Sequence, residues 1–309
     1  MTMLKLQSQT SSKKVTSNKQ LSKKRRRKGR KLYDRLFRAH QINFLVLFAY
    51  RFYIFLLRTV FPVKSLGRNS QWFPVPEYNS WHLRNIRTPA TELVAVGGSF
   101  NTSLSLSGYF QGCYASGLKS SPPVYWSPYK RGVLLLDDFK IPKRLKTYLN
   151  KKPFDLRINT SFEQIVRNSI ENRVKNNILP MYWGEEQIQN FINLYELGYM
   201  ESFEAWQDDK LVGGIWGFRY KGYFLVETMY YETNRASKAA FVHMIEHFRK
   251  TGCWLIDTMR VSDHFVEFGG TEIVRDEFLK MLSQATQGWQ EDLRKKFDVP
   301  NEYLASTIS

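Results

Sequence analysis

The order of helical and strand-like patterns between residues 151 and 283 constrains the fold of this chain more than any other feature. Apolar residues recur at helical spacing over 161–170, 184–197, 237–251 and 275–282. Short apolar or alternating runs, which are typical of strands, cover 202–206, 211–217, 223–229 and 254–257. The resulting order of two helices, three strands, a helix, a strand and a helix favours an α/β fold with a mixed sheet.

The 309 residues are enough for about two folded domains. Strand patterns at 93–98, 124–126 and 133–136, with a helical pattern at 104–114, predict a small α/β unit. A linker over 63–71 precedes it. We therefore expect a basic tail and apolar helix over 1–71, a small N-terminal α/β domain over 72–150, a larger α/β domain over 151–283 and a polar, partly helical C-terminal tail over 284–309.

Positive charge is concentrated near the N-terminus. Residues 1–38 contain 14 Lys and Arg and one acid, Asp34, and so account for most of the formal net charge of +18. The run Lys23–Lys31 has no apolar periodicity, and we expect this tail to be disordered. Charge of this density predicts a polyanionic partner, either nucleic acid or an anionic membrane surface. A solvated charge run without a specific partner and a targeting segment are the alternatives.

The stretch 44–61 is strongly apolar but contains Arg51 and Arg58. A membrane-spanning helix needs about 20 apolar residues, and a charge near its centre is costly. We therefore favour a helix that lies on a membrane surface or on the body of the protein over one that spans the bilayer. Residues 13–61 are accordingly a candidate contact with anionic lipid head groups.

The sequence does not indicate a metal or a cofactor. Two cysteines, Cys113 and Cys253, exclude a disulfide framework and a zinc site with three or four thiolates, and they suit a reducing compartment. His243 and His247 have metal-ligand spacing on one predicted helix, but no third ligand is near them in the sequence. A pair on the helix surface is the favoured interpretation. The common phosphate-loop, nucleophile-elbow and zinc-protease motifs do not occur in the sequence.

Short segments between residues 72 and 282 occur in the order and spacing of one protein family. Val124–Val133 reads Val-Tyr-Trp-Ser-Pro-Tyr-Lys-Arg-Gly-Val. It resembles the Trp-Trp-Ser-Pro-Asp-Pro-Arg-x-Val segment of the leucyl/phenylalanyl-tRNA–protein transferases. Further segments resemble other motifs of this family, namely Leu93–Gly98, Ser202–Trp206, Leu211–Gly217, Glu227–Tyr230 with Ala236–Lys238, and Leu255–Asp257 with His264, Gly269, Ile273, Arg275 and Phe278–Leu279. Each match is weak alone, but the collinear set is specific.

The resemblance implies a fold and an activity. Members of the family move leucine, phenylalanine or methionine from aminoacyl-tRNA to the N-terminal amine of a protein that begins with Arg or Lys, which marks that protein for degradation. They use no metal, and their second domain is a GNAT-like acyltransferase fold. The implied partners are an aminoacyl-tRNA and the N-terminus of an acceptor protein or peptide. We expect a monomer in the cytoplasm, with membrane association through the N-terminal segment as an alternative.

Two carboxylates are the candidate catalytic residues. Asp257 ends one predicted buried strand and Glu227 lies on a neighbouring one, so both can face a shared cleft. Spacing alone favours a strand-end cap for Asp257 and an ion-pair partner for Glu227, whereas the resemblance favours catalysis. Transfer from an ester to an amine needs positioning and a group that attracts the charge or the proton of the amine. Asp257 would be that electrostatic anchor or base, and Glu227 would support it.

Other site residues follow from the resemblance. Trp183 and Met229 are expected to wall the acyl pocket. Further substrate contacts are expected from Trp126, Tyr114 and Met259. Lys130 and Arg131 are candidate contacts to tRNA phosphates, with solvated turn charges as the alternative.

Three positions depart from the family pattern. Met259 replaces a Gln at the reacting centre, and a Met side chain cannot donate a hydrogen bond. Ser116 replaces a Trp near the terminal adenosine of the tRNA, so that Tyr114 or Tyr125 would have to supply the stacking, and Val274 replaces a Pro. A transferase with a changed acceptor and a pseudo-enzyme that binds tRNA or a membrane are therefore further hypotheses. A thioester-dependent acyltransferase is less favoured, because the sequence has no pyrophosphate-binding Arg/Gln-x-x-Gly-x-Gly/Ala loop.

Overall fold

The computed structural model describes residues 52, 55–56, 64–66, 92–116, 123–175 and 184–297. The predictions for the basic tail 1–38 and for Trp183 lie outside the described residues. The chain divides into two units, 1–56 and 57–309. In the first unit, Phe52, Phe55 and Leu56 are helical and exposed, within the stretch predicted as an apolar helix. No helix among the described residues is long and apolar enough to cross a membrane.

The second unit contains a seven-stranded sheet with the strand order β11-β5-β10-β9-β8-β7-β6. In that order the strands are Thr271–Val274, Lys130–Leu135, Leu255–Met259, Tyr223–Tyr231, Lys210–Tyr220, Met200–Gln207 and Asp155–Ile158. Neighbouring strands are antiparallel except β9 and β10, which are parallel and are joined by the helix α7, Ala236–Thr251. A parallel pair needs such a crossover. The mixed sheet confirms the predicted α/β class, and its order of elements is that of the GNAT-like domain that the resemblance implies.

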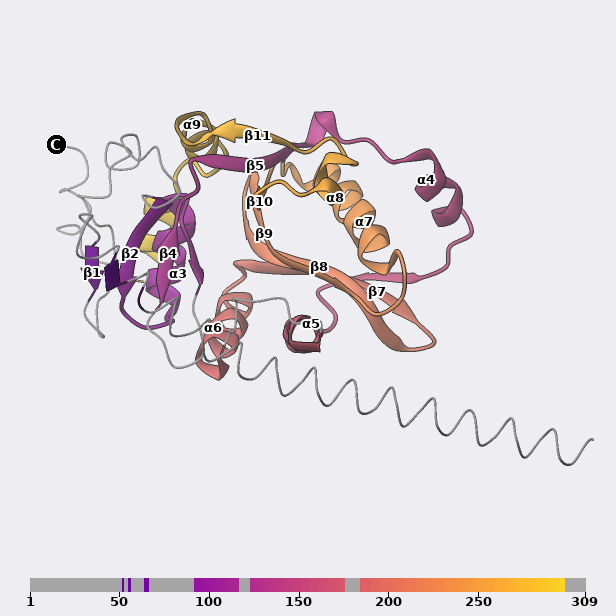
Figure 1. Ribbon diagram of the computed structural model, residues 1–309, viewed down its shortest axis with the longest axis horizontal. Helices are drawn as coiled ribbons and strands as arrows, with labels where there is room; N and C mark the ends of the chain where they lie inside the picture. The colour runs from indigo at the N-terminus through magenta and orange to yellow at the C-terminus, as the bar shows by residue number, and fades with distance from the viewer. Residues whose placement is uncertain are drawn as a thin grey trace, which may run out of the picture. The chain divides into compact units, whose positions relative to one another are not determined.

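Helices cover both faces of this sheet (Figure 1). The other described helices of the unit are α3 (Thr102–Phe110), α4 (Lys143–Leu149), α5 (Phe162–Lys175), α6 (Glu185–Glu196), α8 (Asp263–Val266), α9 (Arg275–Ala285) and α10 (Trp289–Phe297). α7 lies on one face, where Phe248 packs against Phe224 of β9. The opposite face bears α5 and α6, and its core takes in Tyr223 and Leu225 of the same strand. Successive residues of β9 therefore enter two separate cores, as the two-residue period of a strand requires.

A second sheet of four strands has the order β1-β2-β4-β3. Its strands are Lys64–Leu66, Leu93–Gly97, Val124–Trp126 and Tyr114–Ser116. β1 pairs with β2 in the segment 63–71, so the prediction that all of this segment is a linker is wrong. Val94 and Tyr125 of the sheet form a small core with Leu104 of α3.

The boundary between the two sheets lies at Ser127–Tyr129 and does not coincide with the predicted domain boundary at residue 150. The sequence predicts β5 as part of the small domain, but β5 pairs with β10 and β11 in the large sheet. Its residues Val133 and Leu134 enter the cores on opposite faces of that sheet. Burial on both sides stabilises β5 in a central position, which its near-continuous apolar sequence permits.

The helices and strands predicted between 151 and 283 are confirmed as α5, α6, β7, β8, β9, α7, β10 and α9. β6 and β11 were not predicted, because each has four residues and none of them is fully buried. The segment 284–309 was expected to be a polar, partly helical tail, and α10 is its helical part. The ring of Trp289 stacks on Phe110 with centroids 4.6 Å apart, and Leu293 is buried, so α10 belongs to the core.

Candidate active site

The pairing of the parallel strands β9 and β10 ends after three residues. Tyr223–Leu225 pairs with Leu255–Asp257, and no pairing between the two strands continues beyond them. Each strand has a β-bulge just past this point, with Glu227 as the extra residue of β9 and Thr258 as that of β10. A bulge bends its strand and changes the direction of a side chain. Asp257 and Glu227, the predicted catalytic residues, therefore both lie where the parallel strands separate.

Gly217 makes the bulge in β9 sterically possible. It pairs with Val226, and a Cβ atom at position 217 would lie 1.8 Å from the carbonyl oxygen of Leu225. No real Cβ makes such a contact, so a larger residue would displace β9. Gly213 likewise allows the start of α7 to approach β8, since a Cβ there would lie 2.6 Å from that of Ala236. The glycines of the segment 211–217 thus shape the strand that faces Glu227.

Asp257 is fully buried, and its carboxylate is fully used within the protein. Oδ1 accepts hydrogen bonds from Nε of Arg131 at 2.8 Å and from the backbone N–H of Met259 at 2.7 Å. Oδ2 accepts from Nη2 of Arg131 at 2.6 Å and from the hydroxyl of Tyr223 at 2.6 Å. A carboxylate offers about four acceptor positions. Asp257 is therefore suited to holding other groups in place and has little capacity left for a substrate proton.

Arg131 joins three parts of the fold around Asp257. Its guanidinium also donates from Nη1 to the backbone oxygen of Gly112 at 3.1 Å. It lies 4.5 Å from the ring centroid of Phe278 and 5.4 Å from that of Tyr114. The side chain is completely buried, so the predicted contact of Arg131 with a tRNA phosphate is wrong. The reason is that β5 is an interior strand of the large sheet, with its neighbours on both sides.

Glu227 is buried like Asp257, but one of its oxygens has no partner. Oε1 accepts a hydrogen bond from the hydroxyl of Tyr109 at 2.5 Å. Oε2 is buried and accepts none from the residues that the structure describes. Burial raises the pKa of Glu227 to about 7, although the Tyr109 hydrogen bond and the charge of Arg173 act in the opposite direction. Near neutral pH this carboxyl can therefore exist in either charge state, with one oxygen free for an N–H or ammonium group.

The two carboxylates share one face of the sheet. Asp257 pairs with Val133 of β5, and Val133 belongs to the core on the α5 and α6 face. Tyr109, which binds Glu227, belongs to the same core. Met229 instead packs against the core on the α7 face, so it does not share the face of Glu227, and its part in the acyl pocket stays a prediction. Without the bulge, residues 227 and 229 would point the same way, but the extra residue breaks the two-residue alternation.

The other predicted substrate contacts lie near this pair. Met259 has a left-handed backbone with φ of 62°, and its side chain packs against the same core. Tyr114 lies opposite Trp126 in the β3–β4 ladder, and burial raises the pKa of the Tyr114 hydroxyl. The indole N–H of Trp126 donates to Oγ of Ser116 at 2.7 Å. The serine that replaces the family's Trp thus has a Trp partner on the next strand. Whether these residues touch a substrate stays a prediction.

Three residues of the network were not found from the sequence. Tyr109 and Tyr223 each donate to one of the carboxylates, and Arg173 donates from Nε and Nη2 to Oγ1 of Thr228 at 3.1 and 2.5 Å. In sequence, Tyr109 and Tyr223 are apolar-face residues of a helix and a strand. Each is far along the chain from its partner, so no local pattern could reveal the pairing.

Some residues of the shared motifs hold the scaffold together. Glu204 is fully buried and accepts hydrogen bonds from Ser202 at 2.8 Å, from the indole of Trp206 at 3.1 Å and from backbone N–H groups just before α5. The Ser-Phe-Glu-Ala-Trp segment therefore anchors the start of α5. Arg275, at the start of α9, donates to the backbone oxygen of Pro128 at 3.3 Å and so links α9 to the connection between the sheets.

The mixed α/β sheet and its two buried carboxylates fit the acyltransferase that the resemblance of the motifs implies. Comparison with known proteins then shows that the chain belongs to the leucyl/phenylalanyl-tRNA–protein transferase family, which confirms the resemblance of the motifs. The family model for leucyl/phenylalanyl-tRNA protein transferase matches residues 133–283.

Individual relatives support this assignment over most of their length. The leucyl/phenylalanyl-tRNA–protein transferase of Shewanella halifaxensis is 31% identical over 224 residues, which cover 72% of this chain and 91% of that relative. The protein of the same name from Paramagnetospirillum magneticum is 37% identical over 180 residues, or 56% of this chain and 85% of the relative. Among solved structures, an aminoglycoside acetyltransferase from an uncultured soil sample matches with a TM-score of 0.30 and 13% identity, over 38% of this chain and 85% of its own.

Proposed function

We propose that this chain moves leucine or phenylalanine from aminoacyl-tRNA to the N-terminal amine of a protein or peptide. The observation that carries the proposal is the position of Asp257 and Glu227 on one face of the sheet, where β9 and β10 separate. The names of relatives that are 31% and 37% identical support the donor and the type of reaction. The acceptor would begin with Arg or Lys, as the resemblance implies.

The proposed reaction exchanges an ester for an amide. The neutral amine nitrogen of the acceptor attacks the carbonyl carbon of the aminoacyl ester, a C–N bond forms, and the C–O bond to the ribose breaks. The proton lost by the amine is balanced by the one that the ribose oxygen gains as it leaves as a hydroxyl. Protons are conserved overall, so the protein has to position two substrates and handle one proton in transit.

Asp257 and Glu227 would divide these tasks. Because both oxygens of Asp257 are already hydrogen-bonded, its role would be to fix the end of β10 and the backbone of Met259. Glu227 has the unpartnered Oε2 and a pKa raised to about 7 by burial. We therefore assign to Glu227 the direct contact with the reacting amine, as an acceptor of its hydrogen bond or proton.

Contacts with tRNA phosphates are proposed for exposed cations. Lys130 is exposed and lies 3.8 Å from the carboxylate of Glu272. The segment 140–152 carries six cations and no acid, and none of the six forms an ion pair with a described residue. They are Lys140, Lys143, Arg144, Lys146, Lys151 and Lys152. Of these, Lys140, Lys143, Arg144 and Lys151 are proposed for the phosphates. The tail 1–38 would add attraction for the same polyanion. An anionic membrane surface is the alternative partner for residues 13–61.

The test is a transfer assay with the purified full chain. It would be given labelled leucyl-tRNA or phenylalanyl-tRNA and a peptide that begins with Arg, and the product would be identified by mass spectrometry. We expect a new amide on the free N-terminus and none on the same peptide with an acetylated N-terminus. Transfer only to peptides with other first residues would indicate a changed acceptor. Tight tRNA binding without transfer to any peptide would contradict the proposal and support a pseudo-enzyme.

A further inference from the structure

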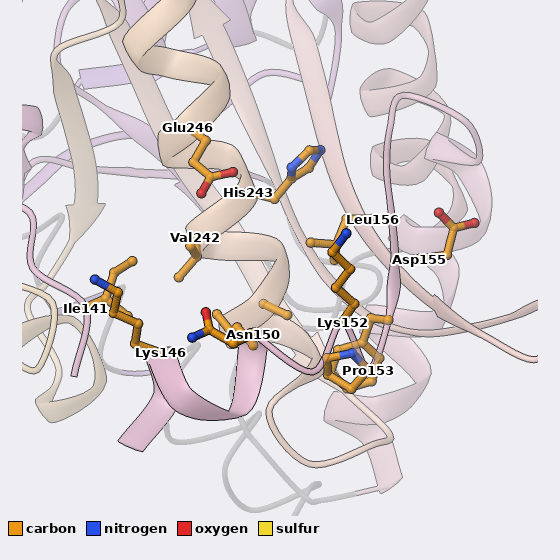
Figure 2. A pocket seen from close by; sticks show the side chains of 13 residues that line it. Ile141, Lys146, Asn150, Lys152, Pro153, Asp155, Leu156, Val242, His243 and Glu246 are labelled. Atoms are coloured by element: carbon orange, nitrogen blue, oxygen red, sulfur yellow. The ribbon is translucent and has the colours of Figure 1, made fainter. Parts of the chain in front are cut away.

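A pocket lies on the face of the large sheet opposite to the carboxylates. It is bounded by α4, α7 and β6 and has a volume of about 470 Å³ (Figure 2). Its floor is apolar and includes Leu149, Phe154, Leu156 and Ala239. Pockets of roughly this volume, with an apolar lining and a few converging polar groups, are typical of small-molecule sites.

Five polar side chains around the pocket are not used by the rest of the protein. They are Lys146, Asn150, Lys152, His243 and Glu246, and none makes a side-chain hydrogen bond or an ion pair with any described residue. Asp155 also lines the pocket, but it is already paired with Arg157 at 2.6 Å. The free charges are therefore two ammonium groups and one carboxylate.

These charges come from different elements and surround the floor. Figure 2 shows Lys146 of α4 and Lys152 of the following turn on two sides, with Glu246 projecting from α7 above them. A purely anionic ligand would meet the charge of Glu246, and a purely cationic one would meet the two lysines. A ligand that carries both charges and an apolar group complements all three features.

We propose that this pocket binds a zwitterion with an apolar side chain, that is, a free α-amino acid or a short peptide. Its carboxylate would contact Lys146 and Lys152, its ammonium group Glu246, and its side chain the floor near Leu149 and Phe154. His243 and Asn150 would add neutral hydrogen bonds. The proposal does not depend on the transfer reaction, because the pocket and the carboxylates lie on opposite faces of the sheet.

The test is a set of titrations of the full chain by calorimetry with four ligands. They separate the contribution of the ammonium group from that of the carboxylate, and a free amino acid from a short peptide. Leucine and the dipeptide Leu-Leu keep both charges, N-acetyl-leucine lacks the ammonium group, and leucinamide lacks the carboxylate. We expect saturable binding of one of the first two, and the stronger of them identifies the source. Each single loss of charge should weaken binding about two- to fivefold, as for a partly exposed ion pair.

Protein variants make the test specific. Glu246→Gln should weaken binding of the zwitterion and should not weaken that of N-acetyl-leucine, which no longer meets a like charge. Lys146→Gln with Lys152→Gln should likewise weaken binding of the zwitterion and should not weaken that of leucinamide. Glu277→Gln and Lys210→Gln change exposed charges elsewhere and serve as matched controls. Two results would overturn the proposal: equal affinity for all four ligands, or no detectable binding of any of them at ligand concentrations up to about 20 mM. So would wild-type binding of inorganic phosphate that is tighter than that of leucine and of Leu-Leu, since that would mark an anion site.

Discussion

Arg131 and Asp257 form a bidentate ion pair in which both side chains are completely buried. The two residues lie on adjacent strands, β5 and β10, and the pair also binds Tyr223 and the backbone of Gly112. Two charges removed from water are tolerated only if each is compensated by the other and by further hydrogen bonds. The pair is therefore a structural element of the site, and any experiment on Asp257 also perturbs the fold.

We expect Asp257→Ala to lower the free energy of unfolding by about 3–5 kcal/mol, because it leaves the Arg131 guanidinium buried without a counter-charge. Urea unfolding of the variant and the wild type measures this directly. The double change Arg131→Met with Asp257→Leu should recover part of the lost stability without recovering transfer activity. An Asp257→Ala protein as stable as the wild type would show that the pair contributes nothing to the fold.

Glu227 should determine how activity depends on pH. Its pKa is raised by burial to about 7, so the fraction of anionic carboxylate falls as the pH drops below that value. We therefore expect kcat/KM for transfer to fall on the acidic side of about pH 7. Glu227→Gln should lower the rate and leave only the acidic limb that protonation of the acceptor amine itself causes, while it keeps an acceptor for the Tyr109 hydroxyl.

Tyr109→Phe is the matched variant. The Tyr109 hydrogen bond lowers the pKa of Glu227, so its loss should move the acidic limb to higher pH. A pH profile that is the same in the wild type, Glu227→Gln and Tyr109→Phe would exclude Glu227 as the group that contacts the amine.

Met259→Gln tests the proposal that Met259 replaces a hydrogen-bonding Gln of the family at the reacting centre. Loss of one hydrogen-bond donor at such a centre costs up to about 10²–10³ in rate, so restoring it should raise transfer to an Arg-initiated peptide. Met and Gln are both unbranched at Cβ, so the left-handed backbone at 259 should tolerate the change. A lower rate in a protein of unchanged stability would indicate that the chain uses a different acceptor, for which an apolar wall is needed.

The fold was largely predictable because its helices and strands have strong apolar periodicity. The motifs also pointed to Asp257 and Glu227, which lie on one face of the sheet, and their catalytic role stays a prediction. The positions of Met229 and Arg131 could not be predicted, because they depend on contacts between strands that are distant in the sequence. The bulge at Glu227 turns Met229 to the other face, and the interior position of β5 buries Arg131. No local pattern marks either event, since a bulge changes the register without changing the composition of the strand.

Gly217→Ala should be strongly destabilising. The added Cβ would meet the carbonyl oxygen of Leu225, a backbone atom that can move only if β9 moves with it. Overpacking of a core costs about 1–3 kcal/mol and occasionally more, and we expect the upper end here because the obstacle is backbone. Gly184→Ala is the control, since no atom lies within 4 Å of a Cβ at that position. Thermal unfolding of both variants measures the difference, and equal melting temperatures would contradict the proposed role of Gly217.

Deletion of residues 1–38 should reduce the salt dependence of tRNA binding. The deletion removes 14 cations and one acid. Each cation that neutralises a phosphate releases a counterion on binding. Each such contact contributes roughly 0.7–0.9 to the slope of log K against log salt concentration. We expect the truncated chain to bind tRNA more weakly at low salt and with a flatter slope. A triple variant, Lys143→Gln with Arg144→Gln and Lys151→Gln, should flatten the slope by a smaller amount, because it removes three cations.

Parallel measurements with anionic liposomes decide whether the tail binds tRNA or a membrane surface. If deletion changes liposome binding and leaves both the affinity for tRNA and its slope unchanged, the tail is a membrane-binding segment, and the contribution that we assign to it in tRNA binding is excluded.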